Sequence, residues 1–196
     1  MYAVFKEKIM ILYTSDIHFG HTNIIKLDHR PFADADIMDE FLIKSWNSRV
    51  NADDDVYVLG DVCYKSAKDP VWYLRQLKGH KHLITGNHDH YLLKDKNAMK
   101  HFETVDALTM IKDGDKDVVL CHYPIVEWNG FFRGTWLVYG HIHNNTTNVA
   151  YQCMKNFDHA LNAGCMINNY APVSFNELVR NNREFQEKQN RDNQER

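Results

Sequence analysis

Five short polar segments, each directly after a short apolar run, constrain the fold of this chain more than any other feature. The segments are Asp16-Ile17-His18, Gly60-Asp61, Gly86-Asn87-His88-Asp89, His122 and Gly140-His141-Ile142-His143. Short apolar runs bounded by turn residues are typical of buried strands. In α/β proteins the carboxyl ends of the strands gather along one edge of the sheet, where ligands bind. The pattern therefore predicts an α/β fold that brings these distant segments together at one edge.

Strand-like and helix-like patterns alternate in the first half of the chain, and strands dominate after residue 100. Strands are expected at residues 9–15, 55–59, 81–85, 104–111, 117–122, 135–139 and 159–165. Helices are expected at residues 34–50, 66–77 and 90–99, the second weakened by Pro70. This order favours a layered α/β protein with one mixed sheet or two sheets. We expect a single domain over residues 1–196, ending in a polar helical tail from about residue 174, where Ser174 and Glu177 form a capping box.

Composition excludes several classes of protein. Hydrophobic residues make up 44% of the 196 residues and charged residues 25%, which is typical of a globular chain and excludes general disorder. The 23 basic and 26 acidic residues give a net charge of −3, which argues against a strongly basic nucleic-acid binder. Twelve histidines is a high count, and several lie beside Asp, Asn or Gly, which indicates metal or proton chemistry.

Targeting signals and cysteine usage indicate a cytoplasmic protein. The segment Met1–Lys8 shows no secretory signal, and the apolar runs are far too short to span a membrane. The four cysteines follow no CxxC pattern, so we expect reduced thiols in a cytoplasm-like compartment.

The polar segments carry enough oxygen and nitrogen atoms to bind more than one metal ion. Asp16 and His18 are two residues apart, so an extended backbone would project both to one side, and His141 and His143 repeat this spacing. Gly60 allows the backbone to approach closely before Asp61. Asn87 and His122 add one oxygen and one nitrogen, which makes seven candidate ligands. Seven ligands are too many for one tetrahedral ion, but they suit two ions that share a carboxylate. Two ions roughly 3.5–4 Å apart stabilise in-line displacement at phosphorus.

The order of motifs DxH, GD, GNHD, H and GHxH, from Asp16 to His143, resembles the calcineurin-like metallophosphoesterases. The resemblance implies a four-layer α/β/β/α sandwich with mixed sheets and a site for two metal ions at the carboxyl ends of the strands. It implies that the first ion is held by Asp16, His18 and His143. It implies that the second ion is held by Asn87, His122 and His141, with Asp61 bridging the two. Such ligands, without thiolate, suit Mn²⁺, Fe²⁺ or Zn²⁺, and the resemblance favours Mn²⁺.

The same resemblance gives His88 and Asp89 catalytic roles. His88 would protonate the leaving oxygen of the substrate, and Asp89 would orient that imidazole or keep it charged. For Asp89, capping a helix that begins near His90 is an equal alternative. Contact with the substrate phosphate is a further role for His21, Arg30 and Arg133, although Arg30 is expected more readily to cap or pair at the surface.

The expected activity is hydrolysis of a small phosphodiester, such as a nucleotide derivative, by metal-activated hydroxide. A phosphomonoesterase, including a phosphoprotein phosphatase, is the alternative, and a non-catalytic scaffold of the same fold is a further one. The net charge and the short chain after the last ligand argue against duplex nucleic acid as a partner. No membrane partner is expected, and a homo-oligomer is left open.

An aromatic loop between His122 and His141 has three interpretations. Trp128, Phe131 and Phe132 could form a stacking platform for a nucleobase. They could also make a subunit contact or pack onto the sheet edge.

Overall fold

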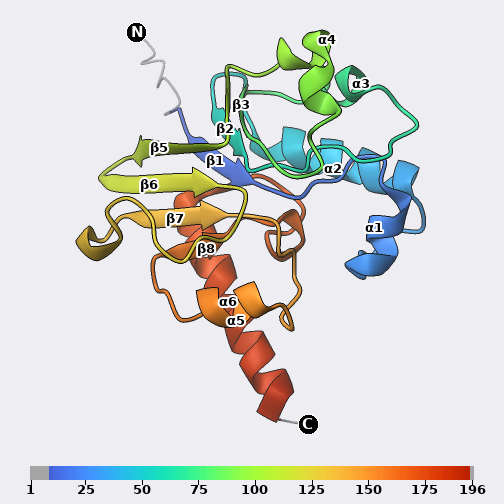
Figure 1. Cartoon of the computed structure of the whole chain (residues 1–196). Helices are drawn as coiled ribbons and strands as arrows, with labels where there is room; N and C mark the ends of the chain where they lie inside the picture. The colour runs from blue at the N-terminus through green and yellow to red at the C-terminus, as the bar shows by residue number, and fades with distance from the viewer. Residues whose placement is uncertain (1–8, 195–196) are drawn as a thin grey trace, which may run out of the picture.

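The computed structural model describes residues 9–194, in which two β-sheets face each other with helices on their outer sides (Figure 1). One sheet has the strand order β4-β3-β2-β1-β9 and the other the order β5-β6-β7-β8. The strands are β1 (Ile11–Thr14), β2 (Asp55–Val58), β3 (His80–Ile84), β4 (Thr104–Asp106), β5 (Leu108–Asp113), β6 (Lys116–Cys121), β7 (Trp136–Tyr139), β8 (Ala160–Asn162) and β9 (Val173–Ser174). The helices are α1 (Thr22–Leu27), α2 (Ala35–Arg49), α3 (Pro70–Leu74), α4 (Lys96–Met99), α5 (Val149–Met154) and α6 (Phe175–Gln194). Single 3₁₀ turns are η1 (Leu92–Lys94), η2 (Phe131–Arg133) and η3 (Cys165–Ile167).

Three apolar clusters define four layers. Because side chains alternate along a strand, Leu12 packs toward α2 and α3 while its neighbour Tyr13 packs between the sheets. In the second sheet Leu120 faces the space between the sheets, and Val119 packs outward with Met154 of α5. The order helix, sheet, sheet, helix confirms the predicted α/β/β/α sandwich.

Both sheets are mixed, as predicted, and their parallel strands position the polar segments. Strands β1 to β4 pair in parallel, and β9 is antiparallel to β1. Strands β6, β7 and β8 are parallel, and β5 is antiparallel to β6. The carboxyl ends of β1, β2, β3, β6 and β7 are therefore free to meet at one edge of the sandwich.

Helix 34–50 is confirmed as α2, whose first turn is capped by the Asp34 carboxylate accepting from the Ile37 N–H at 2.8 Å. The expected helix 66–77 shrinks to α3, which begins at Pro70 because proline suits the first helical position. The expected helix 90–99 is instead two single turns, η1 and α4, separated by Asp95, which caps the second. The expected strand 104–111 divides at Ala107, with β4 in one sheet and β5 in the other.

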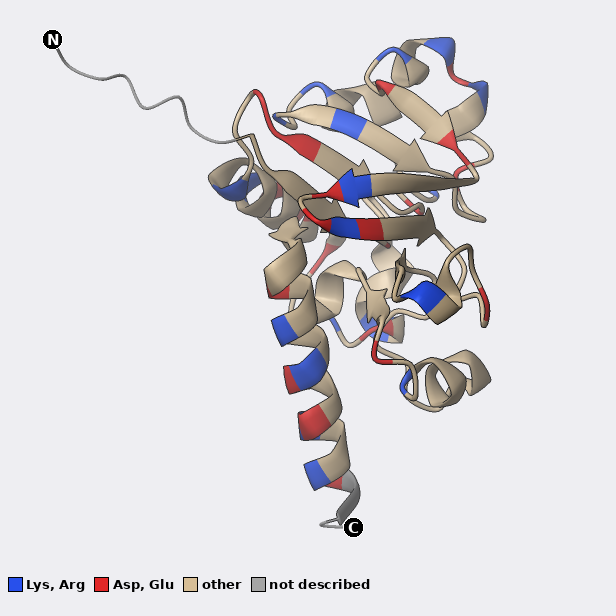
Figure 2. Cartoon of the chain, turned by 90° about the vertical axis from the view of Figure 1, so that its left-hand side faces the viewer, with Lys and Arg blue, Asp and Glu red and all other residues tan. Residues whose placement is uncertain are grey.

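The predicted polar tail is the helix α6, which extends beyond the sheets (Figure 2). The backbone N–H and Oγ of Ser174 donate to the Glu177 carboxylate at 2.9 and 2.8 Å, and Arg49 of α2 pairs with the same carboxylate. Among residues 9–194, no helix is long and apolar enough to cross a bilayer. Residues 1–8, where no secretory signal was expected, lie outside the described residues.

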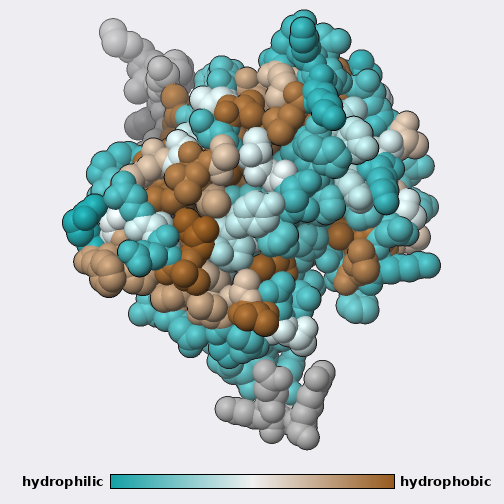
Figure 3. All heavy atoms as spheres, viewed as in Figure 1, coloured by the Kyte–Doolittle hydropathy of each residue, from teal (hydrophilic) through white to brown (hydrophobic). Residues whose placement is uncertain are grey.

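Apolar side chains gather on one face, around the edge strand β5 (Figure 3). Leu108 and Met110 of β5 are exposed. An edge strand leaves the backbone groups on its outer side unpaired. The apolar face around β5 contrasts with the polar surface around the strand ends, which is described next.

Candidate metal centre

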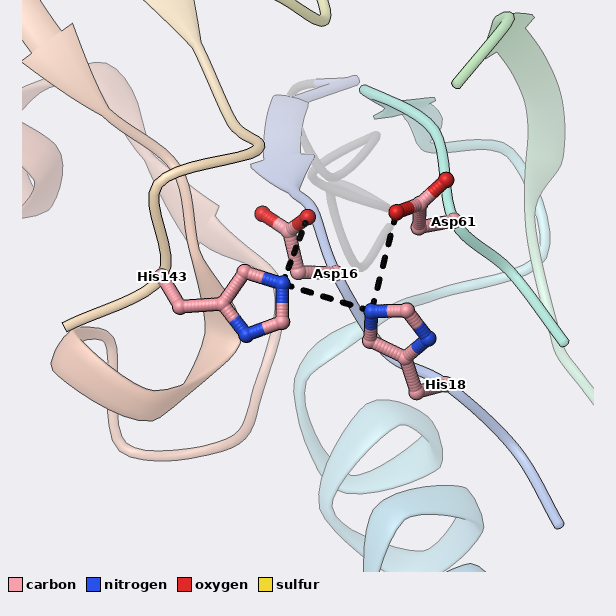
Figure 4. A group of neighbouring side chains, drawn as sticks. All are labelled: Asp16, His18, Asp61 and His143. Carbon is pink, nitrogen blue, oxygen red and sulfur yellow. Dashed lines mark hydrogen bonds and ion pairs between the residues drawn. The ribbon is translucent and has the colours of Figure 1, made fainter. Parts of the chain in front are cut away.

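Four side chains from three strand ends converge into one compact group (Figure 4). Asp16 and His18 follow β1, Asp61 follows β2, and His143 follows β7. Each offers one ligand atom, and these atoms all lie within 4.8 Å of one another. Asp16, His18 and Asp61 are buried, and His143 is nearly so. We call these residues the first ligand group.

The hydrogen bonds of His143 turn its free nitrogen toward the group. Its Nδ1 lies 2.8 Å from a carboxylate oxygen of Asp28, which can only accept, so Nδ1 carries the proton. Its Nε2 then faces the Nε2 of His18 at 3.4 Å and Oδ1 of Asp16 at 3.5 Å. The Nε2 of His18 lies 3.6 Å from Oδ2 of Asp61. This set of acceptor atoms facing one another suits a bound cation.

The pKa shifts within the first ligand group also favour a bound cation. Burial opposes charge on His143, yet Asp28 and Asp16 raise its pKa overall, so the carboxylates attract a positive charge to this place. Burial raises the pKa of Asp16 and, together with His143 and Arg30, places the pKa of His18 well below its usual value. A neutral imidazole is the form that binds a metal ion, and a metal ion competes with protons for such sites.

The remaining three predicted ligands form a looser second ligand group, Asn87, His122 and His141. Nδ1 of His122 donates to the Leu59 carbonyl at 2.7 Å, which leaves Nε2 facing Oδ1 of Asn87 at 3.1 Å and Oδ2 of Asp61 at 3.7 Å. The rings of His122 and His141 lie 5.2 Å apart. The structure thus brings all seven predicted side chains to one edge, with Asp61 between the two groups. Their roles as ligands stay a prediction.

Five of these seven residues have a left-handed backbone, which sequence reasoning missed. The φ angles of Asp16, His18, Asp61, His141 and His143 lie between 53° and 71°. The expectation that Asp16 and His18 converge from an extended segment is therefore wrong, since each ligand is aimed by a local turn. Non-glycine residues pay about 1–3 kcal/mol for such conformations, which cluster at functional sites. All five are Asp or His, which adopt a left-handed backbone more often than most non-glycine residues, so residue type was the one available signal of these turns.

The glycines of the motifs are required by close approach. A Cβ at Gly60 would lie 2.5 Å from Nδ1 of His122, which confirms the expectation for this position. A Cβ at Gly86 would overlap Oδ1 of Asp61, and one at Gly140 would overlap Oγ of Ser15. Any side chain at these positions would displace a predicted ligand or the loop that carries it.

Arg30 lies beneath the site and neither contacts substrate space nor pairs at the surface, so both expectations for it are wrong. It is buried, and its guanidinium donates to the carbonyls of Asp16 and Ile17 at 2.8 Å each and to Asp28 at 2.9 Å. Although burial opposes it, the bonds from His143 and Arg30 lower the pKa of Asp28. No motif or spacing in the sequence links Asp28 to His143, 115 residues away.

Asp89 braces the loop of Asp61. Its buried carboxylate accepts from the backbone N–H of Asp61 and Val62 at 2.9 Å and of Gly86 at 2.8 Å. Burial raises its pKa to about 6. These contacts are not those of a helix cap, and the expected role of Asp89 in orienting His88 or keeping it charged stays a prediction. Asp89 holds two ligand loops together.

His88 lies at the rim of the site. Its backbone N–H donates to Oδ1 of Asp61 at 2.8 Å, and its ring Nε2 is 4.0 Å from Oδ2 of the same residue. The side chain is 32% exposed. It lines a pocket of about 610 Å³ together with His18, His141, His143 and His21, which we call the metal pocket. The contact of His21 with substrate remains a prediction, and His21 does line the metal pocket, as that contact would require.

The aromatic loop packs onto the second sheet. Trp128 is buried, donates from Nε1 to the Thr135 carbonyl at 2.8 Å, and contacts Phe131 and Phe157. Phe132 is 86% exposed. Neither this loop nor Arg133 lines the metal pocket. Packing onto the sheet is therefore the supported interpretation, and the stacking platform is not.

No family model matches the sequence, but individual relatives do. The chain is 33% identical over 172 residues to the uncharacterized protein MJ1445 of Methanocaldococcus jannaschii, covering 87% of this chain and 89% of the relative. It is 32% identical over 160 residues to the Gene 66 protein of Mycobacterium phage L5, covering 67% of this chain and 76% of the relative.

Solved structures are also similar to this chain. The protein of unknown function AQ665 from Aquifex aeolicus matches with a TM-score of 0.68 and 27% identity, over 88% of this chain and 99% of that one. The phosphoesterase YfcE from E. coli matches more weakly, with a TM-score of 0.36 and 17% identity, over 68% and 69% of the two chains. Two mixed sheets with a His/Asp cluster at one edge are what the motif resemblance predicted. The chain belongs to the family that contains MJ1445 and the phage Gene 66 protein.

Proposed function

We propose that this protein is a metal-dependent phosphoesterase and, more specifically, a phosphodiesterase that acts on a small substrate. The observation that carries the proposal is the first ligand group, whose ligand atoms lie within 4.8 Å of one another beside an accessible pocket. A buried set of acceptor atoms of this kind is costly unless a cation is bound. Its chemistry, carboxylate and imidazole without thiolate, is that of hydrolytic metal sites.

Two divalent ions, for which we propose Mn²⁺, fit the donor set. Asp16, His18 and His143 would hold the first, Asn87, His122 and His141 the second, and Asp61 would contact both. Ions bound there would activate water and offset negative charge on the phosphoryl oxygens.

His88 is suited to transfer a proton to the leaving oxygen. Its backbone is fixed by Asp61, while its ring remains partly exposed at the rim of the metal pocket. A general acid must reach the substrate without being held by the metal, and this position meets both needs. His21 and His88 both line the pocket, and His21 is buried enough that burial lowers its pKa and favours the neutral ring. We assign the role of proton donor to His88, whose ring is partly exposed at the rim of the pocket.

The charge of the pocket favours a diester over a monoester. Among the described residues that line the metal pocket there is no Lys or Arg, and Asp28 is already paired with Arg30 and His143. A phosphodiester carries one negative charge, whereas a monoester carries close to two near neutral pH. The extra charge of a monoester would find no Lys or Arg here to pair with it.

The test is hydrolysis of bis(p-nitrophenyl) phosphate and p-nitrophenyl phosphate in parallel, with Mn²⁺ and after chelation. We expect chelator-sensitive activity that favours the diester. Activity that favours the monoester would replace the proposal with a phosphomonoesterase. Folded protein that binds metal but hydrolyses neither compound would contradict the proposal and favour a scaffold.

A further inference from the structure

A second recess adjoins the metal pocket on the far side of His88. Its volume is about 210 Å³, and its walls include Tyr64, Lys65, Lys68 and Tyr91. His88 lines both cavities and is the one residue common to their described linings. None of the seven predicted metal ligands lines the second cavity, which we call the tyrosine recess.

Two aromatic rings, those of Tyr64 and Tyr91, line the tyrosine recess. The Tyr64 ring lies 4.1 Å from the ring of His88 and 4.8 Å from that of His21, measured between centroids. Tyr91 is 71% exposed, an unusual state for a large aromatic side chain at a cavity wall. Two tyrosines at one small cavity offer flat surfaces to a planar ring.

The charge of the tyrosine recess is the opposite of that of the metal pocket. Lys65 and Lys68 line it, and none of its described lining residues is acidic. Lys68 is paired with Asp36 at 2.6 Å. Lys65 is exposed, its Nζ lies 5.1 Å from the centroid of the Tyr64 ring, and no carboxylate within residues 9–194 pairs with it. A cation without a protein partner beside two aromatic rings suits a ligand that is both planar and anionic.

We infer that the tyrosine recess binds the leaving group of the substrate, and that this leaving group is a nucleotide. The inference rests on the proposed function, because it takes His88 as the proton donor. In hydrolysis, water forms a new P–O bond and releases a proton to solvent, while the bond from phosphorus to the leaving oxygen breaks. That oxygen accepts the proton of His88, so the departing group must lie beside His88. The cavity beside His88 that lacks metal ligands is the tyrosine recess.

The chemistry of the recess specifies what departs. The base of the nucleotide stacks on Tyr64 and Tyr91, and its own phosphate contacts Lys65. A neutral alcohol would leave both the rings and the cation without a partner. The substrate class is therefore a phosphodiester whose leaving group is a nucleotide, with its base in a cavity of about 210 Å³.

The test uses binding, which does not depend on turnover. Adenosine 5′-monophosphate and adenosine are titrated by calorimetry into the full-length protein and into Tyr64→Leu, Tyr91→Ala and Lys65→Gln. Loss of a stacking ring is expected to weaken binding of both compounds about tenfold. Lys65→Gln is expected to weaken binding of the monophosphate roughly threefold and to leave binding of adenosine unchanged. Tyr91 is exposed, so Tyr91→Ala tests the recess even where Tyr64→Leu fails to fold.

Matched controls are Phe132→Ala, an exposed aromatic on another loop, and Lys44→Gln, an exposed lysine on α2, and both should bind like the wild type. Absent binding of the monophosphate, or equal binding by all variants, would overturn the inference. So would binding that is weakened by Leu27→Ala in the metal pocket and unaffected by the tyrosine variants. If the wild type binds through Tyr91 but hydrolyses no phosphate ester, the recess stands and the proposed function fails.

Discussion

The two ligand groups differ in how firmly the protein holds them. In the first group, His143 is bound through Nδ1 to Asp28, and Asp28 is fixed by the buried Arg30. In the second group, His122 is fixed by the Leu59 carbonyl, but the ring of His141 makes no hydrogen bond among the described contacts. Partners of this outer kind orient ligands and strengthen metal binding. We expect the first group to bind its ion more tightly than the second.

Arg30 explains the rigidity of the first group. One guanidinium contacts the carbonyls of Asp16 and Ile17 as well as the Asp28 carboxylate, so it joins the loop after β1 to the loop after β7. Among the described contacts of Asn87, His122 and His141, no buried cation joins the loops that carry these residues. The second group relies on Asp61, and on Asp89 behind it, for its connection to the first.

Replacing Asp61 should have the largest effect, because Asp61 is the residue that the two groups share. Its Oδ2 lies 3.6 Å from His18 and 3.7 Å from His122. We expect Asp61→Ala to lose at least one ion. We also expect kcat/KM to fall by more than about 100-fold, which is the upper end of the loss seen when a residue that only supports a metal ligand is replaced. Metal analysis and diester hydrolysis measure the two effects. Full occupancy in a folded variant would show that the groups are independent.

Replacing His88 should separate chemistry from metal binding. We expect His88→Ala to keep the metal content of the wild type and to lose about 100-fold in kcat on diesters with alkyl leaving groups. Diesters with a p-nitrophenyl leaving group need little protonation and serve as the control. A full rate on the alkyl diesters would remove His88 as the proton donor.

The sequence predicted which residues meet but not how they are held. The ligand motifs follow strands, and parallel strands align their carboxyl ends, so Asp16 and His143 could be brought together without knowledge of the turns. Asp and His adopt a left-handed backbone more often than most residues, but which of them do so here depends on tertiary contacts. Asp28 and Arg30 belong to the site only because the fold brings them beneath it. In the same way, residues 104–111 form one continuous apolar pattern, and the change of sheet at Ala107 is set by the sandwich.

Replacing Asp28 tests the comparison directly. In Asp28→Asn the amide can no longer act as a charged acceptor for Nδ1 of His143, so the first ion should bind about tenfold more weakly. His141→Ala, which removes a predicted ligand of the second group, should weaken binding of the second ion alone. Competition with a fluorescent chelator, fitted to two binding steps, distinguishes the variants. Equal weakening of the same step by both would show that the groups are not distinct.

The smallest expected effect concerns the backbone at His141, where φ is 71°. Glycine ordinarily destabilises a folded protein relative to alanine, but it adopts a left-handed backbone without strain. In the metal-free protein we therefore expect His141→Gly to be more stable than His141→Ala by about 1 kcal/mol in urea unfolding.

Both variants lack the imidazole, so their difference isolates the backbone. The same pair of changes at Lys44, in the middle of α2, should show the ordinary order, with alanine more stable. If alanine is also more stable at position 141, the loop is not strained in the metal-free protein.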